Sequence, residues 1–200
     1  MATDPRAKRA FDVAGAIAGL LVFAPPMAVV AAAILLADGR PLLFRQTRLA
    51  SGRRPFTILK FRSMRNGEVT AVGRVLRATG LDELPQLLNV LAGDISAVGP
   101  RPLTEEDVWR LGWTTAACDF RWSVPQGLTG LAQIVGARSD RHALWLDRRY
   151  VARQNLRLDT RLIAWSFAVN VLGKRRVQQL IAGARRGRPR RPRMRLYCPR

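Results

Sequence analysis

Residues 13–37 read VAGAIAGLLVFAPPMAVVAAAILLA, a run of 25 residues without a charged side chain. A helix that spans the hydrocarbon core of a bilayer needs about 20 such residues. Ala24-Pro25-Pro26 interrupts the run near its middle. Proline lacks a backbone N–H and clashes with the preceding helical turn, so a helix must kink or break there. The protein therefore begins with a broken apolar segment that needs either a membrane or a deep protein core.

Four interpretations of this segment differ in where its two ends lie. It is longer than the apolar region of about 7–15 residues in a secretory signal peptide. A kinked spanning helix, a re-entrant helix–break–helix and a buried hairpin of a soluble protein remain. Basic residues flank both ends: Arg6, Lys8 and Arg9 before it, and Arg40, Arg45 and Arg48 after it. Such flanks favour the cytoplasm, which suits a re-entrant element, although the residues alone leave the spanning form equally open.

The composition predicts anionic partners. The chain has 200 residues, of which 34 are Lys or Arg and 14 are Asp or Glu, giving a net charge of +20. Eleven of the basic residues lie in 174–200, where no acidic residue occurs. A strongly basic protein binds nucleic acid, phosphorylated substrates or an acidic membrane surface. No nucleic-acid fold motif accompanies the tail, so contact with anionic lipids is the simpler interpretation.

We expect three parts along the chain. Residues 1–40 form the membrane-associated element, residues 41–173 the catalytic domain and residues 174–200 a basic tail that is disordered beyond Gly183. The patterns predict a helix-rich α/β mixture, with short strands in 41–65 and extended loops at 98–102 and 125–130. Helices are predicted over 72–78, 84–91, 105–113, 144–152 and 158–172.

Asp82-Glu83 is the leading candidate for chemistry. The pair directly precedes the predicted helix 84–91, where acidic residues also occur simply as caps. Cations lie on the elements to either side: Lys60, Arg62, Arg74, Arg77 and Arg101. A carboxylate pair among cations can serve phosphate chemistry, with one carboxylate holding Mg²⁺ and the other attacking phosphorus. Spacing alone does not show that these groups converge.

These residues also resemble a known family, the bacterial sugar transferases or monotopic phosphoglycosyl transferases. The likeness covers about residues 8–172 and is carried by a series of motifs in the expected order: RAFD at 9–12, KFRSM at 60–64, GRVLR at 73–77, LDELPQLLNVL at 81–91, GDISAVGPRP at 93–102, GLTGLAQ at 127–133, and Leu146-Asp147 with Tyr150-Val151. Each motif is moderately specific, and the series is highly specific.

The resemblance implies a fold, a reaction and a set of site residues. It implies a re-entrant N-terminal helix in the bacterial inner membrane and a catalytic domain facing the cytoplasm. It implies transfer of a phosphosugar from a UDP-sugar to undecaprenyl phosphate, with release of UMP, at the start of exopolysaccharide, O-antigen or glycan assembly. Asp82 would be the nucleophile and Glu83 the Mg²⁺ ligand. Lys60, Arg62 and Arg101 match motifs that line the phosphate and nucleotide site.

Two departures from the family pattern support a rival interpretation. The segment between Met64 and Gly73 is short, and Pro125-Gln126-Gly127 carries an extra residue. These changes suggest a catalytically impaired, membrane-bound scaffold of a glycan-assembly complex as one alternative. A nucleic-acid-binding protein driven by the tail is the other. The sequence names neither the sugar nor the oligomeric state.

Overall fold

The computed structural model describes residues 4–183 and confirms a helix-rich α/β mixture. Within that range the strands form three two-stranded sheets. Strands β1 (Leu43–Leu49) and β2 (Pro55–Phe61) make an antiparallel hairpin around the 3₁₀ turn η1 (Ser51–Arg53), and β3 (Met64–Arg65) pairs with β4 (Glu68–Val69). Strands β5 (Ser96–Val98) and β6 (Gly127–Thr129) pair in parallel.

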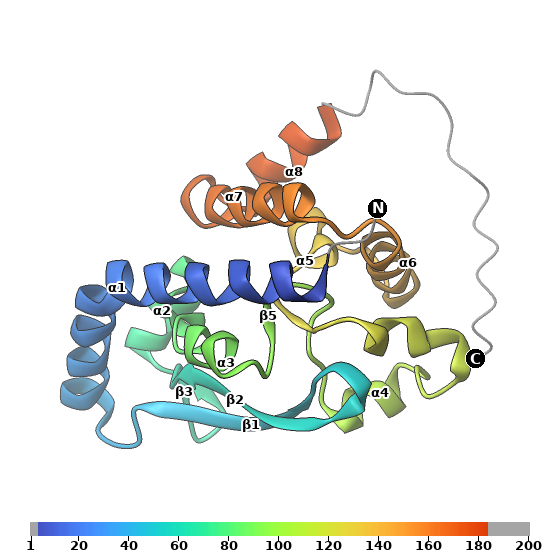
Figure 1. The fold of residues 1–200 in the computed structure, drawn as a ribbon. Coiled ribbons are helices and arrows are strands. Elements are labelled where there is room, and N and C mark those ends of the chain that lie inside the picture. The colour runs from blue at the N-terminus through green and yellow to red at the C-terminus, as the bar shows by residue number, and fades with distance from the viewer. Residues whose placement is uncertain (1–3, 184–200) are drawn as a thin grey trace.

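The apolar segment forms one long helix that bends at its prolines. Helix α1 (Pro5–Asp38) contains Pro25 and Pro26, and Figure 1 shows its two halves at a steep angle to one another. The helix is apolar enough to cross a membrane, with a mean hydropathy of 2.5 over 18 residues, of which only 11% are buried. The large uncovered side chains include Leu21, Val22, Val29 and Leu36. A soluble hairpin would cover such residues, so this exposure argues against a buried core hairpin.

Buried polar contacts fasten the first half of α1 to the rest of the fold. Lys8 Nζ lies 2.7 Å from Asp159 Oδ2, and both side chains are buried. One turn further, Asp12 Oδ1 accepts hydrogen bonds from Ser96 Oγ and from the backbone N–H of Ala97 in β5. Because buried charges are stable only when paired, these contacts fix both where α1 lies along the domain and which side of the helix faces it.

The far end of α1 is also bonded to the domain. Arg62, just after β2, donates to the carbonyl oxygens of Asp38, Gly39 and Arg40 at 2.8–2.9 Å. The last carbonyls of a helix lack partners within it, so a guanidinium there satisfies several at once. Both ends of the broken helix are thus held by one compact body.

Two helices joined by a 3₁₀ turn follow the small β3–β4 sheet. Helix α2 (Ala71–Thr79) follows β4, and the 3₁₀ turn η2 (Leu81–Glu83) leads into α3 (Gln86–Ala92).

Where β5 meets β6, a Cβ on Gly99 would collide with the carbonyl oxygen of Pro125, and a Cβ on Gly127 would collide with the backbone N of Gly99. Glycine at both positions lets the two chains approach this closely.

The remaining helices complete the domain, and the last two of them lie on the side of α1 away from the hairpin (Figure 1). After α4 (Glu105–Arg110) and the 3₁₀ segment η3 (Ala116–Ser123) come α5 (Leu131–Val135), α6 (Asp140–Val151), α7 (Leu156–Leu172) and α8 (Lys174–Gly183). Tyr150 of α6 packs with Val98 and Leu162 in one buried cluster and donates its hydroxyl toward the carbonyl oxygen of Val98 and toward Asp159 Oδ1.

The structure differs from the sequence predictions in three places. Residues 127–129, predicted as loop, form β6, because β5 supplies a partner strand that local pattern does not show. The helix predicted over 84–91 begins at Gln86, after Pro85. Helix α8 extends the fold past residue 173, with Val177 fully buried. The predicted disorder beyond Gly183 lies outside the described residues.

Breaking the buried ion pair should cost far more stability than breaking an exposed one. Lys8→Met leaves the buried Asp159 carboxylate without its cation, so we expect a loss of about 3–5 kcal/mol in the free energy of unfolding. Arg110→Met, which breaks the exposed pair with Asp107, should have little effect, because water screens that pair. Urea unfolding of the detergent-solubilised protein measures both. Equal losses would contradict the anchoring role of Lys8.

Candidate active site

The carboxylate pair lies in a 3₁₀ turn between two helices. Asp82 and Glu83 belong to η2, which follows Gly80 in the left-handed conformation (φ 73°). The pattern predicts the pair just before a helix that starts at Leu84, whereas α3 starts two residues later, after Leu84 and Pro85.

Lys60 reaches Glu83 from strand β2. Its Nζ lies 2.6 Å from Glu83 Oε1, with the lysine side chain 15% exposed. Asn89 of α3 holds the two elements in register, because its amide donates to the carbonyl oxygen of Thr57 and accepts from the N–H of Leu59. This contact anchors α3 on β2 and so brings Lys60 opposite the turn that carries Glu83.

Asp82 is held in an environment that disfavours its charge. Burial, and then the neighbouring carboxylate of Glu83, raise the pKa of Asp82 above its ordinary value, while Lys60 and Arg77 act in the opposite direction. Desolvation and like charge both favour the protonated form. Asp82 consequently keeps its proton to a higher pH than a solvated aspartate does, and an approaching cation would favour its ionised form.

A narrow cleft adjoins Glu83 and gathers three cations. Its lining comprises Arg48, Ile58, Lys60, Glu83, Gln86, Arg101, Pro102, Gly127, Leu128 and Gln133. The structure thus brings together Lys60, Glu83 and Arg101, three of the residues that the motifs single out. Asp82 lies beside this group on η2 but does not line the cleft.

Arg48 is a cleft residue that sequence reasoning missed. Its guanidinium donates to the carbonyl oxygen of Pro102 at 2.7 Å and to Gln46 Oε1 at 2.8 and 3.2 Å. Burial, and then the nearby charge of Arg101, lower its pKa. Two arginines held together in a partly buried site repel one another, which favours an anion between them. Arg48 was read only as a membrane flank, and nothing in its spacing marked it as different.

The loop that carries Arg101 rests on a buried support. Arg121 donates to the carbonyl oxygen of Arg101 at 2.9 Å and pairs with Asp147 Oδ2 at 2.7 Å. Its guanidinium is 1% exposed and lies over the rings of Trp113 and Trp122. Cation–π contacts and the ion pair with Asp147 stabilise the buried charge of Arg121. Its hydrogen bond to the backbone of Arg101 then holds the loop in place, while the Arg101 side chain stays exposed.

The other predicted cations lie outside the cleft. The guanidinium of Arg62 is committed to the end of α1. Arg74 and Arg77 are exposed on α2. Arg77 still acts electrostatically on Asp82, whereas Arg74 is not among the cleft residues. Substrate contact by these three arginines stays a prediction.

The two departures from the family pattern are accommodated away from the cleft floor. Gln126 is fully buried and donates to the carbonyl oxygens of Arg121 and Val124. Its own carbonyl accepts from the N–H of Ser96, which extends the β5–β6 pairing. The shortened segment before Gly73 is the β3–β4 hairpin. Neither feature breaks the contact between Lys60 and Glu83.

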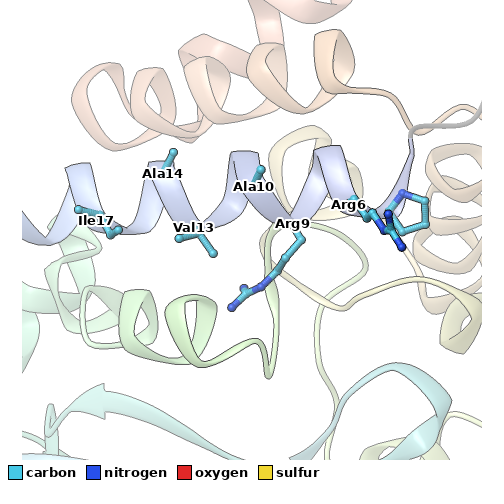
Figure 2. A pocket seen from close by; sticks show the side chains of 7 residues that line it. Arg6, Arg9, Ala10, Val13, Ala14 and Ile17 are labelled. Carbon is cyan, nitrogen blue, oxygen red and sulfur yellow. The ribbon is translucent and has the colours of Figure 1, made fainter.

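A second hollow lies along the first half of α1, lined by Pro5, Arg6, Arg9, Ala10, Val13, Ala14 and Ile17 (Figure 2). Figure 2 shows Arg9 reaching toward α3, where it donates to the carbonyl oxygens of Val90 and Leu91. Arg9 therefore closes the end of α3, and the hollow is an open, mostly apolar strip without acidic residues. The charged groups Lys60, Glu83 and Arg101 line the other cleft instead.

A carboxylate pair thus lies beside a cleft lined by three cations, which is chemistry that suits an anionic ligand. The family model for bacterial sugar transferases matches residues 3–173, so the chain belongs to the bacterial sugar transferase family.

Curated relatives extend this finding. The chain is 43% identical over 168 residues to a UDP-glucose:undecaprenyl-phosphate glucose-1-phosphate transferase of Caulobacter vibrioides, covering 76% of this chain and 62% of that protein. It is 36% identical over 187 residues to the exopolysaccharide production protein PSS of Rhizobium leguminosarum, covering 78% and 90%. An N-acetylgalactosaminephosphotransferase of Aeromonas hydrophila acting on undecaprenyl phosphate is 38% identical over 142 residues, covering 64% and 34%. The chain thus spans less than two thirds of the Caulobacter and Aeromonas proteins.

Neutralising Asp82 should stabilise the protein in a pH-dependent way. A carboxyl whose pKa is raised on folding binds more protons in the folded state, so it lowers stability as pH rises through that pKa. We expect Asp82→Asn to raise the melting temperature by a few degrees at pH 7 and to have no effect well below pH 3.8, where the carboxyl is protonated in both states.

Asp107→Asn is the matched control of opposite sign. Hydrogen bonding to Arg110 lowers the pKa of Asp107, so this carboxylate stabilises the fold above its unfolded pKa and stops doing so as pH falls. Asp107→Asn should therefore lower the melting temperature at pH 7. A fall for both variants at pH 7 would contradict the account of Asp82.

Proposed function

We propose that the protein transfers a phosphosugar from a UDP-sugar to undecaprenyl phosphate and releases UMP, as the first membrane step of exopolysaccharide or other glycan assembly. Family membership and the printed activities of the relatives support this function. The observation that carries it is the contact between Lys60 and Glu83 next to Asp82, at the edge of a cleft with Arg48 and Arg101. Cations suit the diphosphate, and a partly buried carboxylate suits attack on it.

The first half-reaction uses Asp82 as nucleophile. An Asp82 carboxylate oxygen attacks the sugar-bearing phosphorus, and the bond from that phosphorus to the bridging oxygen breaks. UMP leaves with the bridging oxygen, and an acyl phosphate joins Asp82 to the sugar phosphate. Lys60, Arg48 and Arg101 offset the negative charge of the diphosphate as it approaches the carboxylate.

The second half-reaction returns the enzyme to its starting state. An oxygen of the lipid phosphate attacks the same phosphorus, the bond to the Asp82 oxygen breaks, and the carboxylate is restored. Dividing the transfer lets one site take a soluble donor and a lipid acceptor in turn.

Mg²⁺ is the proposed cofactor, with Glu83 as its protein ligand and Asp82 beside it. No group of three or more metal-binding side chains occurs within residues 4–183. Mg²⁺ commonly takes one or two carboxylates and completes its shell with water and substrate phosphates, so the carboxylate pair fits this ion. When bound, it would neutralise phosphate charge that the carboxylates repel.

The membrane element is proposed to be re-entrant, with the catalytic domain on the cytoplasmic side of the inner membrane. The ties of Lys8 to Asp159 and of Arg62 to residues 38–40 hold both ends of α1 on one domain, which supports entry and exit on the same side. The half of α1 after Pro26 is about 18 Å long, shorter than a hydrocarbon core of about 30 Å. Basic residues near the surface would also attract anionic lipids.

The nucleophile can be tested by trapping its intermediate. Wild-type protein with Mg²⁺ and a radiolabelled UDP-sugar, without lipid acceptor, should release one UMP per enzyme and retain label at Asp82. Asp82→Asn keeps the side-chain shape but removes the anion, so UMP release and labelling should both fall at least about 10³-fold. Normal turnover by Asp82→Asn would falsify the covalent route and favour direct transfer between the two substrates.

The cofactor can be tested by chelation. We expect excess EDTA to abolish UMP release and added Mg²⁺ to restore it. Glu83→Gln should need a much higher Mg²⁺ concentration for half-maximal activity, because it loses the ligand's charge. The exposed Glu105 of α4 gives a matched control, since Glu105→Gln should leave the Mg²⁺ requirement unchanged. An unaltered requirement in Glu83→Gln would exclude Glu83 as ligand.

The topology can be tested by cysteine labelling in intact cells. Ala7→Cys and Phe44→Cys place thiols at exposed positions on either side of the broken helix, with the native cysteines replaced by serine. A re-entrant helix leaves both thiols unlabelled by an impermeant reagent until the cells are permeabilised. Labelling of one thiol alone in intact cells would establish a spanning helix.

A further inference from the structure

Two glutamines of the cleft have buried amide atoms that no group of the protein satisfies. Gln86 Nε2 and Gln133 Oε1 are both inaccessible and have no hydrogen-bond partner, and both residues line the cleft with Glu83 and Lys60. The Gln86 side chain is almost fully buried, with 3% of the residue exposed. Buried polar atoms are nearly always hydrogen-bonded, so a donor and an acceptor left open in one cleft point to a bound group.

The neighbours of Gln133 determine which of its atoms is available. Its Nε2 donates toward the carbonyl oxygen of Leu128 at 3.4 Å, so the amide nitrogen is directed at β6 and the oxygen is left open. An amide oxygen accepts hydrogen bonds and cannot donate them. Gln133 Oε1 therefore needs an N–H or an O–H from whatever occupies the cleft.

A diphosphate does not provide that group. Near neutral pH its non-bridging oxygens are acceptors, and the cleft already offers them the cations Arg48, Lys60 and Arg101. The open oxygen of Gln133 is therefore suited to an uncharged N–H or O–H group of a ligand rather than to its phosphates. Gln86 lies three residues after Glu83 and offers a neutral donor within the same cleft.

We propose that Gln86 and Gln133 form a neutral recognition pair for the nucleotide-sugar, which rests on the function proposed above. Gln133 Oε1 accepts from an N–H or O–H of the uncharged part of the donor, and Gln86 Nε2 donates to a carbonyl or hydroxyl oxygen. Two parts of a UDP-sugar carry this chemistry: the imide edge of uracil and the hydroxyl groups of the sugar. The pair sets specificity, while the arginines and Lys60 supply attraction common to every nucleotide diphosphate.

Equilibrium binding separates the two sources without requiring turnover. The full-length chain in detergent, carrying Asp82→Asn to prevent transfer, is titrated with UMP, CMP, UDP, UDP-glucose and UDP-N-acetylgalactosamine in the presence of Mg²⁺. The variants are Gln86→Met and Gln133→Met. Gln154→Met is the matched control, because Gln154 Oε1 is likewise buried without a partner but does not line the cleft.

We expect each cleft variant to bind its matching ligand about tenfold more weakly than the Gln154→Met control. Gln86→Met removes an open polar atom at similar volume, so its melting temperature should be equal to or above that of the parent. Gln133→Met also loses the long hydrogen bond to the carbonyl oxygen of Leu128, so its melting temperature should stay close to that of the parent. If the pair contacts uracil, affinity for UMP and UDP falls and the preference for UMP over CMP disappears. If it contacts the sugar, UMP and CMP binding are unchanged, and the UDP-sugars lose whatever affinity they have beyond UDP.

Two results would overturn the proposal. One is that both cleft variants bind all five ligands as the control does. The other is an equal loss for all five, CMP included, which would assign the amides to the phosphates. Failure of the parent protein to bind any uridine nucleotide is a different outcome, because it contradicts the proposed function itself.

Discussion

The attachment of helix α1 at both of its ends is the constraint on which the rest of the structure depends. Lys8 and Asp12 bind α7 and β5 through buried contacts, and Arg62 binds the last carbonyls of the helix. Strand β5 runs directly into the loop that carries Arg101, and Tyr150 and Asp159 join that strand to the same network. Helix α1 is consequently part of the framework that positions the cleft. Its first turns are held in place by the polar contacts of Lys8 and Asp12.

The cleft is assembled from segments that are distant in sequence, and each is positioned by backbone contacts. Asn89 fixes α3 on β2, which aligns Lys60 with Glu83. Gly99 and Gly127 let the backbones at β5 and β6 approach closely, which brings Arg101 and Gln133 to the same cleft. Arg121 supports the Arg101 loop from below. Rigid support of this kind keeps like-charged side chains close together before any substrate offsets their repulsion.

Local patterns in the sequence were enough to predict the parts of the fold that depend on local physics. The broken apolar helix, strand β2 and the helix around Leu87 and Leu88 all follow from composition and period. The 127–129 strand could not be predicted, because three residues become a strand only beside β5. Likewise the contact of Arg62 with the end of α1 could not be predicted, because its partners are backbone carbonyls, which leave no pattern in the sequence. Arg48 looked like any other basic flank. The convergence of Lys60, Glu83 and Arg101 came from motif resemblance rather than from spacing.

The double attachment of α1 also has a kinetic meaning. A domain held by both ends of one membrane-seated helix keeps its cleft at a constant height above the bilayer and has little freedom to tilt. Its encounters with a lipid substrate then become a search in two dimensions, governed by lateral diffusion and by the mole fraction of that lipid in the leaflet. The soluble substrate would still arrive from three dimensions, so on the proposed two-step route the two half-reactions would respond to different measures of concentration. Diluting the membrane with inert lipid would slow one half and leave the other untouched.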